Sequence, residues 1–201
     1  MKSLLVGLAL FWATLAHGAE ELLPEPQLND SGLHHQDWFL ESFLDIGEDL
    51  AEAQANGRGL VIVFEQRGCP YCREMHRVNL RIPATVEAIR ANFDVLQLDL
   101  RGSREVTDTD GEAMEEREIA RRWGVVFTPT LIFLPSDADP AGQPANMAAA
   151  AVMPGYFKPF HFDSMFEFVA SGAYRDSQFQ DYLGLRAERL RAEGKDVTIW
   201  D

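Results

Sequence analysis

The sequence predicts an α/β fold in which a central mixed β-sheet is flanked by helices on both faces. Three observations support this prediction. Short apolar runs rich in β-branched residues alternate along the chain with segments whose apolar residues recur at helical spacing. Glycine and proline separate these segments. The 201 residues, 46% of them hydrophobic and 25% charged, suit one domain with short additions.

The first half of the fold is expected to contain three helices and two strands. An extra N-terminal helix is expected over residues 38–56, where apolar side chains approximate helical spacing and Asn56-Gly57 supplies a stop. The run at 60–64 is apolar at every position, which is typical of a strand buried on both faces. The other elements of this half are a helix at 69–80, a short helix at 83–91 and a strand at 93–98.

The second half begins with an acidic segment, 99–112, which is expected to be an exposed loop. Its stretch from Asp108 to Gly111 lacks the ligand spacing of an EF-hand, so we interpret it as a solvated face. The remaining expected elements are a helix at 113–123, a strand at 130–134, a loop at 136–146, a candidate strand at 148–153 and helices at 160–171 and 177–192. The last helix either packs on the domain or frays, and its spacing does not decide which.

The chain is expected to divide into a signal peptide at 1–18, an N-terminal tether at 19–36, the α/β domain at 37–175 and a C-terminal helical extension at 176–201. The signal peptide is indicated by Lys2, an apolar run from Leu4 to Leu15 and small residues before Glu20. A bilayer-spanning helix needs about 20 apolar residues, so secretion is favoured over an uncleaved anchor. We expect a periplasmic or otherwise exported protein that does not insert into the membrane and meets conditions in which disulfides persist.

Charge argues against one class of partner. The chain carries 18 Lys and Arg residues against 32 Asp and Glu residues, a formal net charge of -14. A surface of this sign repels a phosphate backbone. Nucleic acid is therefore not expected among the partners.

Both cysteines fall in one motif, Cys69-Pro70-Tyr71-Cys72, directly after the expected buried strand and at the start of a helix. Their spacing on a helix brings the two sulfurs to the same face, close enough to bridge. Cys69 would face the unpaired N–H groups and the positive end of the helix dipole, which favour thiolate over thiol. We therefore expect Cys69 to be the nucleophile that attacks a disulfide, and Cys72 to resolve the mixed disulfide.

Other interpretations of the cysteine pair are weaker. A structural disulfide across two intervening residues closes a very small loop and contributes little stability, and a structural zinc site lacks a second cysteine pair. A copper site remains an alternative, because His76 follows Cys72 by four residues and could join Cys69 and Cys72 as a third ligand. We expect instead that His76 is an exposed helical residue and that the protein holds no metal or other cofactor.

The strand leading into Glu65 to Cys72, followed by Gly124-Val125 and Thr128-Pro129-Thr130, resembles the thioredoxin superfamily. More narrowly, the chain resembles the SoxW-type periplasmic thioredoxin-like proteins associated with sulfur oxidation, over roughly residues 37–184. The resemblance implies a thioredoxin fold. It also implies that Pro129 is cis and lies against the cysteine pair, and that the backbone of Thr128 contacts a substrate strand.

Glu65 is the candidate for a proton relay to Cys72. Thioredoxins proper keep a buried aspartate where this chain has Val63 and a tryptophan where it has Gly68. Proton transfer to and from Cys72 must then use water or another acid, and Glu65 lies between the strand and the motif. The alternative is that Glu65 is a solvated loop acid.

These observations predict an exported thiol-disulfide oxidoreductase that uses Cys69 and Cys72, with the reductase direction implied by the resemblance. The expected partners are a cysteine-containing exported substrate protein, in sulfur oxidation or cytochrome maturation, and a membrane thiol-disulfide carrier that donates electrons. A monomer is expected. The alternatives are an oxidant or isomerase of the same fold, the copper-binding module, and a non-catalytic thioredoxin-like interaction domain.

Overall fold

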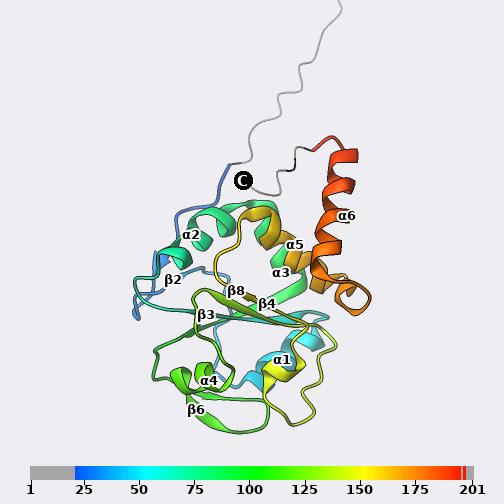
Figure 1. Ribbon diagram of the computed structural model, residues 1–201. Coiled ribbons are helices and arrows are strands. Elements are labelled where there is room, and N and C mark those ends of the chain that lie inside the picture. The colour runs from blue at the N-terminus through cyan, green and yellow to red at the C-terminus, as the bar shows by residue number, and fades with distance from the viewer. Residues whose placement is uncertain (1–20, 196, 198–201) are drawn as a thin grey trace, which may run out of the picture.

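The computed structural model describes residues 21–195 and 197, so the predicted signal peptide lies outside the described residues. A four-stranded sheet forms the centre of the molecule (Figure 1). Its order is β4 (Phe93–Asp99), β3 (Gly59–Glu65), β7 (Thr130–Leu134) and β8 (Ala151–Pro154). Strand β3 runs parallel to β4 and antiparallel to β7, which itself pairs antiparallel with β8. The sheet is therefore mixed, as the sequence predicts.

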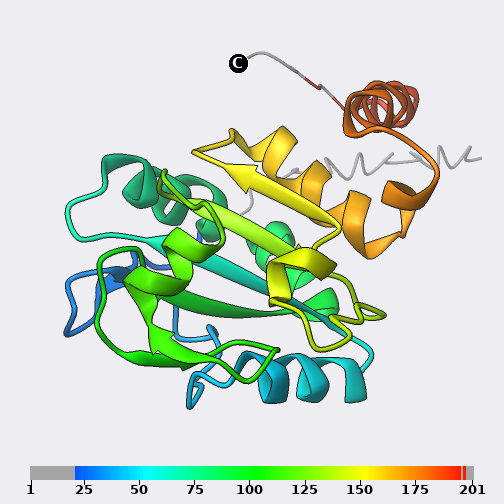
Figure 2. The ribbon, with the colours of Figure 1, turned by 60° about the horizontal axis from the view of Figure 1, so that its bottom comes forward.

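Helices cover both faces of the sheet because β3 sends apolar side chains to both sides. Val61 and Val63 pack with α2 (Pro70–Val78), α3 (Pro83–Asn92) and α5 (Pro159–Ala170). Leu60, Ile62 and Phe64 pack on the opposite face with α1 (Ile46–Ala55) and α4 (Glu116–Arg122). Figure 1 and Figure 2 show these two layers on either side of the sheet. Every residue of β3 is buried, which confirms the expected central strand.

The extra N-terminal helix is shorter than the expected 38–56. Helix α1 begins only at Ile46, after Asp45, whose side chain accepts a hydrogen bond from the Glu48 amide at 3.0 Å and caps the helix. Leu44 has a φ of 65°, which is incompatible with a continuous right-handed helix. Phe43 is fully exposed, whereas Phe39 packs in the core. The apolar spacing before Asp45 therefore reflects an irregular segment that inserts some side chains and exposes others.

The acidic segment at 99–112 is more ordered than the expected exposed loop. Strand β5 (Glu105–Thr107) pairs antiparallel with β6 (Ala113–Glu115), so the expected helix at 113–123 begins at Glu116 instead. Glu115 and Glu118 form a capping box that stops the strand and starts the helix. The interpretation of Asp108 to Gly111 as a solvated face is wrong for Asp108, which is 1% exposed.

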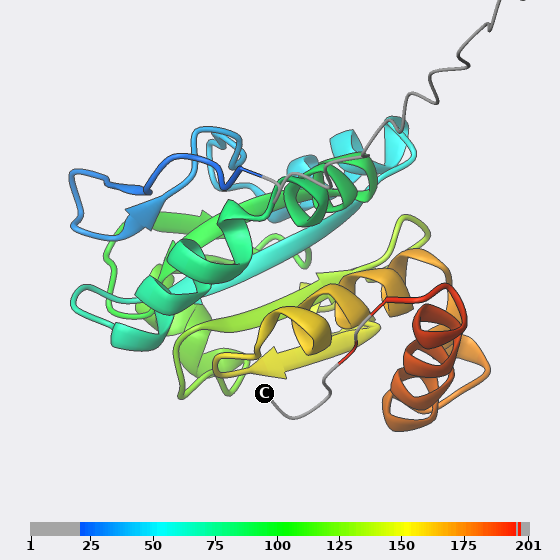
Figure 3. The ribbon, with the colours of Figure 1, turned by 90° about the horizontal axis from the view of Figure 1, so that it is seen from above.

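The described part of the predicted tether packs on the domain. Strands β1 (Gln27–Leu28) and β2 (His34–His35) form a small antiparallel hairpin that lies beside α2, as Figure 3 shows. Leu33 is buried, and the Leu23 amide donates to the carbonyl of Arg81 at 2.8 Å. The segment from residue 21 therefore belongs structurally to the folded domain.

The C-terminal helix also packs on the domain. Helix α6 (Phe179–Ala192) lies against α5 (Figure 3) and buries Leu183 and Ala187. Arg186 Nε donates to a Glu167 carboxylate oxygen of α5 at 2.6 Å. Three short 3-10 turns complete the described elements, at Asn79–Arg81, Ala145–Ala148 and Ala173–Arg175. In the described part of the chain, no helix is both long and apolar enough to cross a membrane.

Candidate redox site

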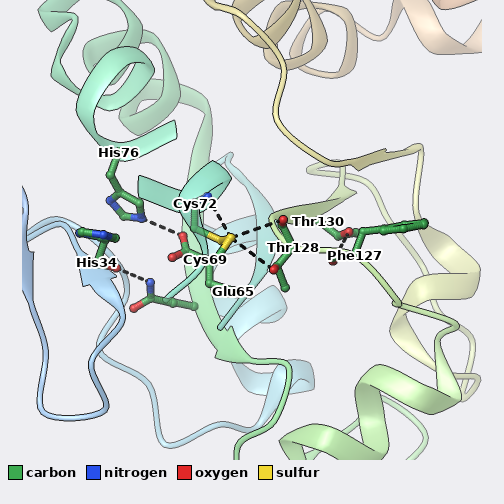
Figure 4. Close-up of a disulfide and its surroundings, with 9 residues drawn as sticks. His34, Glu65, Cys69, Cys72, His76, Phe127, Thr128 and Thr130 are labelled. Carbon is green, nitrogen blue, oxygen red and sulfur yellow. Dashed lines mark hydrogen bonds and ion pairs between the residues drawn. A yellow bond between two sulfur atoms is a disulfide. The ribbon is translucent and has the colours of Figure 1, made fainter. Parts of the chain in front are cut away.

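A disulfide between Cys69 and Cys72 lies where β3 leads into α2, with the two Cα atoms 5.3 Å apart (Figure 4). Gly68 has a φ of 72°, which a residue without a Cβ adopts readily, and the chain turns there into the helix. Pro70 occupies the first turn, where its missing N–H costs nothing. The exposed fractions are 6% for Cys69 and 1% for Cys72, so Cys69 is the more accessible sulfur residue.

Cys69 is the N-cap residue of α2. The backbone N–H of Cys72 donates to Cys69 Sγ at 3.0 Å. This N–H belongs to the first turn of the helix and has no carbonyl partner within it. In the dithiol form the same donor and the helix dipole favour a thiolate on Cys69.

The loop before β7 approaches the same sulfur. The peptide bond between Thr128 and Pro129 is cis. The Thr128 hydroxyl donates to Cys69 Sγ at 3.3 Å, and the Thr128 carbonyl oxygen lies 3.4 Å from that sulfur. The Thr130 hydroxyl donates to the Phe127 carbonyl at 2.8 Å and ties the loop together. Because β7 pairs with β3 and places Thr130 opposite Phe64, this loop ends beside the turn that carries Cys69.

Sequence reasoning predicted only a backbone role for Thr128, so the hydroxyl contact to Cys69 was missed. A Thr-Pro pair before a strand gives no indication of which sulfur its side chain will meet. The pairing register of β3 and β7 supplies that information.

Glu65 is the last residue of β3 and is fully buried. The alternative that it is a solvated loop acid is therefore wrong. Its Oε1 atom lies 2.7 Å from Nε2 of His76. Among the described residues, its Oε2 atom is buried with no hydrogen-bond partner. Figure 4 shows the carboxylate on the side of the cysteine pair that faces His76.

His76 is fully buried, so the expectation of an exposed helical residue is wrong. It lies one turn after Cys72 on the inward face of α2, which also carries Met75. Its Nδ1 atom lies 3.1 Å from Nε2 of Gln36, while Nε2 meets Glu65. Both ring nitrogens are thus engaged away from the sulfurs, which disfavours the copper alternative. Within residues 21–195, no group of three or more His, Cys, Asp or Glu side chains could hold a metal ion.

Two residues near Glu65 and His76, Gln36 and His34, were not identified as site residues from the sequence. Gln36 contacts His76 directly, and the His34 ring lies 5.7 Å from the His76 ring. Burial lowers the pKa of His34, and the nearby His76 lowers it further. Both residues belong to the segment interpreted as a tether. The one signal in the sequence that this segment packs on the domain was the apolar Leu33 next to two histidines.

Three large apolar side chains next to the site in sequence are exposed to solvent: Tyr71 in the motif, and Val126 and Phe127 before Thr128. Their exposed fractions are 61%, 71% and 64%. Exposed apolar side chains on the two segments that carry Cys69 and Thr128 are typical of a surface that meets a protein partner.

Comparisons with known proteins show which domain family the chain matches and which solved structures it resembles. A family model described as a thioredoxin-like domain matches residues 46–170. A thioredoxin-fold protein from Helicobacter pylori has a TM-score of 0.51 and 19% identity, covering 67% of this chain and 87% of its own. A thioredoxin from Thermus thermophilus has a TM-score of 0.48 and 24% identity, with coverages of 67% and 94%. The C-terminal domain of DsbD from Neisseria meningitidis, in the reduced form, has a TM-score of 0.42 and 16% identity, with coverages of 62% and 91%. The sequence has no match among curated proteins.

Proposed function

Because this chain belongs to the thioredoxin-like domain family, we propose that it is an exported thiol-disulfide oxidoreductase that reduces disulfides of partner proteins. The family and the adjacent Cys69–Cys72 disulfide fit thiol-disulfide exchange in general. The observation that supports the roles most directly is that a helix N–H and the Thr128 hydroxyl both donate to Cys69 Sγ. These donors stabilise negative charge on that sulfur, which is what a nucleophile and leaving group requires.

The reaction begins with the dithiol form. The Cys69 thiolate attacks one sulfur of a partner disulfide, a new S–S bond forms, and the other partner sulfur leaves as a thiolate. Cys72 then loses its proton to Glu65 and attacks Cys69 Sγ, which restores the intramolecular disulfide and releases the second partner thiolate. Two electrons pass to the partner, whose thiolates take up protons from solvent.

The partner is proposed to dock across the loop that carries Thr128 and Pro129. An extended segment next to the partner disulfide would contact the Thr128 backbone, while the exposed Tyr71, Val126 and Phe127 side chains would bury apolar surface. The docking site would thus place the partner sulfur in line with Cys69.

The cellular setting rests on the predicted signal peptide at 1–18. In this proposal a membrane thiol-disulfide carrier returns the cysteine pair to the dithiol form, and the protein acts as a monomer. The substrate is an exported protein with cysteines, and sulfur oxidation and cytochrome maturation are the candidate settings.

Trapping tests the assigned roles. Cys72→Ser should accumulate mixed disulfides with partner proteins, because the resolving thiol is gone. Cys69→Ser should accumulate none and serves as the matched control, since it also keeps one cysteine. Equal trapping by the two variants, or none by either, would contradict the proposal.

The reduction potential of the cysteine pair tests the direction of transfer. A value near about -270 mV is characteristic of thioredoxin, whereas about -120 mV is characteristic of the strong oxidant DsbA. We expect the former from equilibration with glutathione or a thioredoxin standard. A potential near about -120 mV would instead indicate that the protein is an oxidant of the same fold.

A further inference from the structure

The Glu65 carboxylate is held in an unusual way for a buried charge. Removing a carboxylate from water is costly unless hydrogen bonds compensate for the lost hydration. Only Oε1 of Glu65 has a partner, His76, while Oε2 is buried without one among the described residues. A buried polar atom left unsatisfied in a folded protein calls for an explanation, and a catalytic role is one of the few available.

The orientation of the hydrogen bonds follows from Gln36. Its Nε2 is an amide group that only donates, so the Nδ1 atom of His76, 3.1 Å away, must accept. The single proton of a neutral ring then resides on Nε2 of His76, which donates to Oε1 of Glu65 at 2.7 Å. Each hydrogen bond in the row is therefore donated toward Glu65, and Oε2 is the carboxylate oxygen that has no hydrogen-bond donor among the described residues.

The row of hydrogen bonds from Gln36 through His76 to Glu65 lies near Cys72. Cys72 and His76 lie on the same buried face of α2, four residues apart, and His76 contacts Glu65 at the end of β3. In Figure 4 the Glu65 carboxylate lies between the His76 ring and the cysteine pair. The thiol of Cys72 must lose its proton before it can attack Cys69. An open carboxylate oxygen in this place is a suitable acceptor.

We propose that Gln36 and His76 are positioning residues that hold the Glu65 carboxylate with Oε2 free to take the proton of Cys72. The inference rests on the proposed function and deepens it. It assigns a part in the redox step to residue 36, which lies outside the family-matched region that begins at residue 46. The N-terminal segment that carries Gln36 then contributes to the redox site.

The step balances without any further reactant. The S–H bond of Cys72 breaks, the proton passes to Oε2 of Glu65, and the electron pair stays on sulfur. That sulfur forms a bond to Cys69 Sγ while the bond from Cys69 to the partner breaks and the partner leaves as a thiolate. His76 keeps its Nε2 proton and Gln36 keeps its amide protons throughout.

Other charged groups surround the pair and will contribute to any pH profile. His34 approaches the His76 ring from β2, and the electrostatic fields of Arg73 and Arg77 on α2 also reach His34. Asp99 lies opposite Glu65 in the parallel pairing of β3 and β4. None of these four side chains hydrogen-bonds to the Glu65 carboxylate in the described part of the chain. Substitution of Gln36 leaves all four in place, so any change in the pH profile can be assigned to the loss of the Gln36 amide.

The experiment measures resolution of a preformed mixed disulfide in the full-length protein, as a function of pH. Gln36→Leu should slow the release of the partner thiol by about tenfold and shift the pH profile of that rate. The effect is smaller than the loss of rate expected when a general base itself is removed. Gln27→Leu is the matched control, because Gln27 lies in the same segment with an exposed side chain. It should resolve at the unsubstituted rate. The labelling rate of Cys69 by an alkylating reagent should be the same in both variants.

His76 gives a second, independent readout. His76→Gln, which keeps a donor near the position of Nε2, should retain most of the rate, whereas His76→Leu should be as slow as Glu65→Gln. The double variant Glu65→Gln/His76→Leu should be no slower than Glu65→Gln alone, because the two residues act as one unit. If His76→Leu does not fold, Gln36→Leu and His76→Gln still decide the matter.

The outcomes separate this inference from the proposed function. If Gln36→Leu resolves at the unsubstituted rate with an unchanged pH profile, while Cys72→Ser still traps partners, the positioning role is wrong and the oxidoreductase stands. If Cys72→Ser traps nothing, the proposed function itself fails.

Discussion

The hydroxyl of Thr128 donates a hydrogen bond of 3.3 Å to Sγ of Cys69, although the two residues are 59 positions apart in the chain. Two strands bring them together. Cys69 follows β3, Thr128 precedes β7, and the antiparallel pairing of these two inner strands places the two loops at the same end of the sheet. The redox sulfur thus receives one donor from its own helix and another from a distant segment.

Removal of that hydroxyl should make Cys69 less reactive. A hydrogen bond to a charged group contributes about 1.5 kcal/mol or more, and about 1.4 kcal/mol corresponds to a tenfold change in equilibrium. In a Cys72→Ser background, Thr128→Val should therefore lower the thiolate fraction of Cys69 by about tenfold at acidic pH. Ultraviolet thiolate absorbance and the alkylation rate measure it. Thr128→Ser keeps the hydroxyl and should react nearly as fast as Thr128 itself, and equal rates for the Val and Ser variants would show that the contact is unimportant.

Asp108 should be a major determinant of stability. Its buried carboxylate accepts hydrogen bonds from Trp123 Nε1 at 2.9 Å and from the Ala145 amide at 2.8 Å, and it lies 3.3 Å from an Arg122 nitrogen. Asp108→Ala leaves these donors unsatisfied and should lower the free energy of unfolding by about 3 kcal/mol. Urea denaturation measures the change, with an unaltered slope as the sign of a two-state effect.

The control for Asp108 is its neighbour Asp110, which also pairs with Arg122 but lies near the surface. Asp110→Ala should change stability little, because solvent screens exposed ion pairs. Comparable losses for Asp108→Ala and Asp110→Ala would argue that charge on Arg122, rather than the buried network, is responsible.

Asp163 should make stability fall as the pH rises through the acidic range. Burial raises the pKa of its carboxyl above the ordinary 3.8, while the hydrogen bond from Thr85 and the charge of Arg186 oppose the shift. The folded state therefore binds a proton more tightly than the unfolded state. The contribution is fully favourable below about pH 3.8 and is lost as the pH rises through the folded-state pKa.

Asp163→Asn isolates this effect. The amide oxygen can still accept from the Thr85 hydroxyl, which lies 2.9 Å from Asp163 Oδ1. The variant should be more stable than the unsubstituted protein at neutral pH, and the difference should vanish below about pH 3.8. Urea unfolding at a series of pH values measures it. A difference that does not depend on pH would mean that packing, rather than the charge, is altered.

The sequence by itself determined the central sheet and the place of the cysteine pair. The strands expected at 60–64, 93–98 and 130–134 lie within or coincide with β3, β4 and β7, respectively. A strand buried on both faces must be apolar throughout, so a run of consecutive apolar residues is enough to predict it. The position of Cys69 at the start of α2 is equally local, because Pro70 and the preceding Gly68 define the turn.

Only the tertiary structure decided which polar side chains are buried. Glu65 and His76 are buried and come from a strand and a helix, and no local pattern relates them to each other or to the partly buried Gln36 of the N-terminal segment. Asp108 was likewise expected in solvent because its neighbours in sequence are polar, yet Trp123 and Ala145 enclose it. Hydrophobic spacing reports which residues avoid water, whereas a buried polar group depends on a partner that the fold brings from far along the chain. The cysteine pair can therefore be predicted from the sequence, whereas the burial of Glu65 and its connection through His76 to Gln36 appear only in the fold.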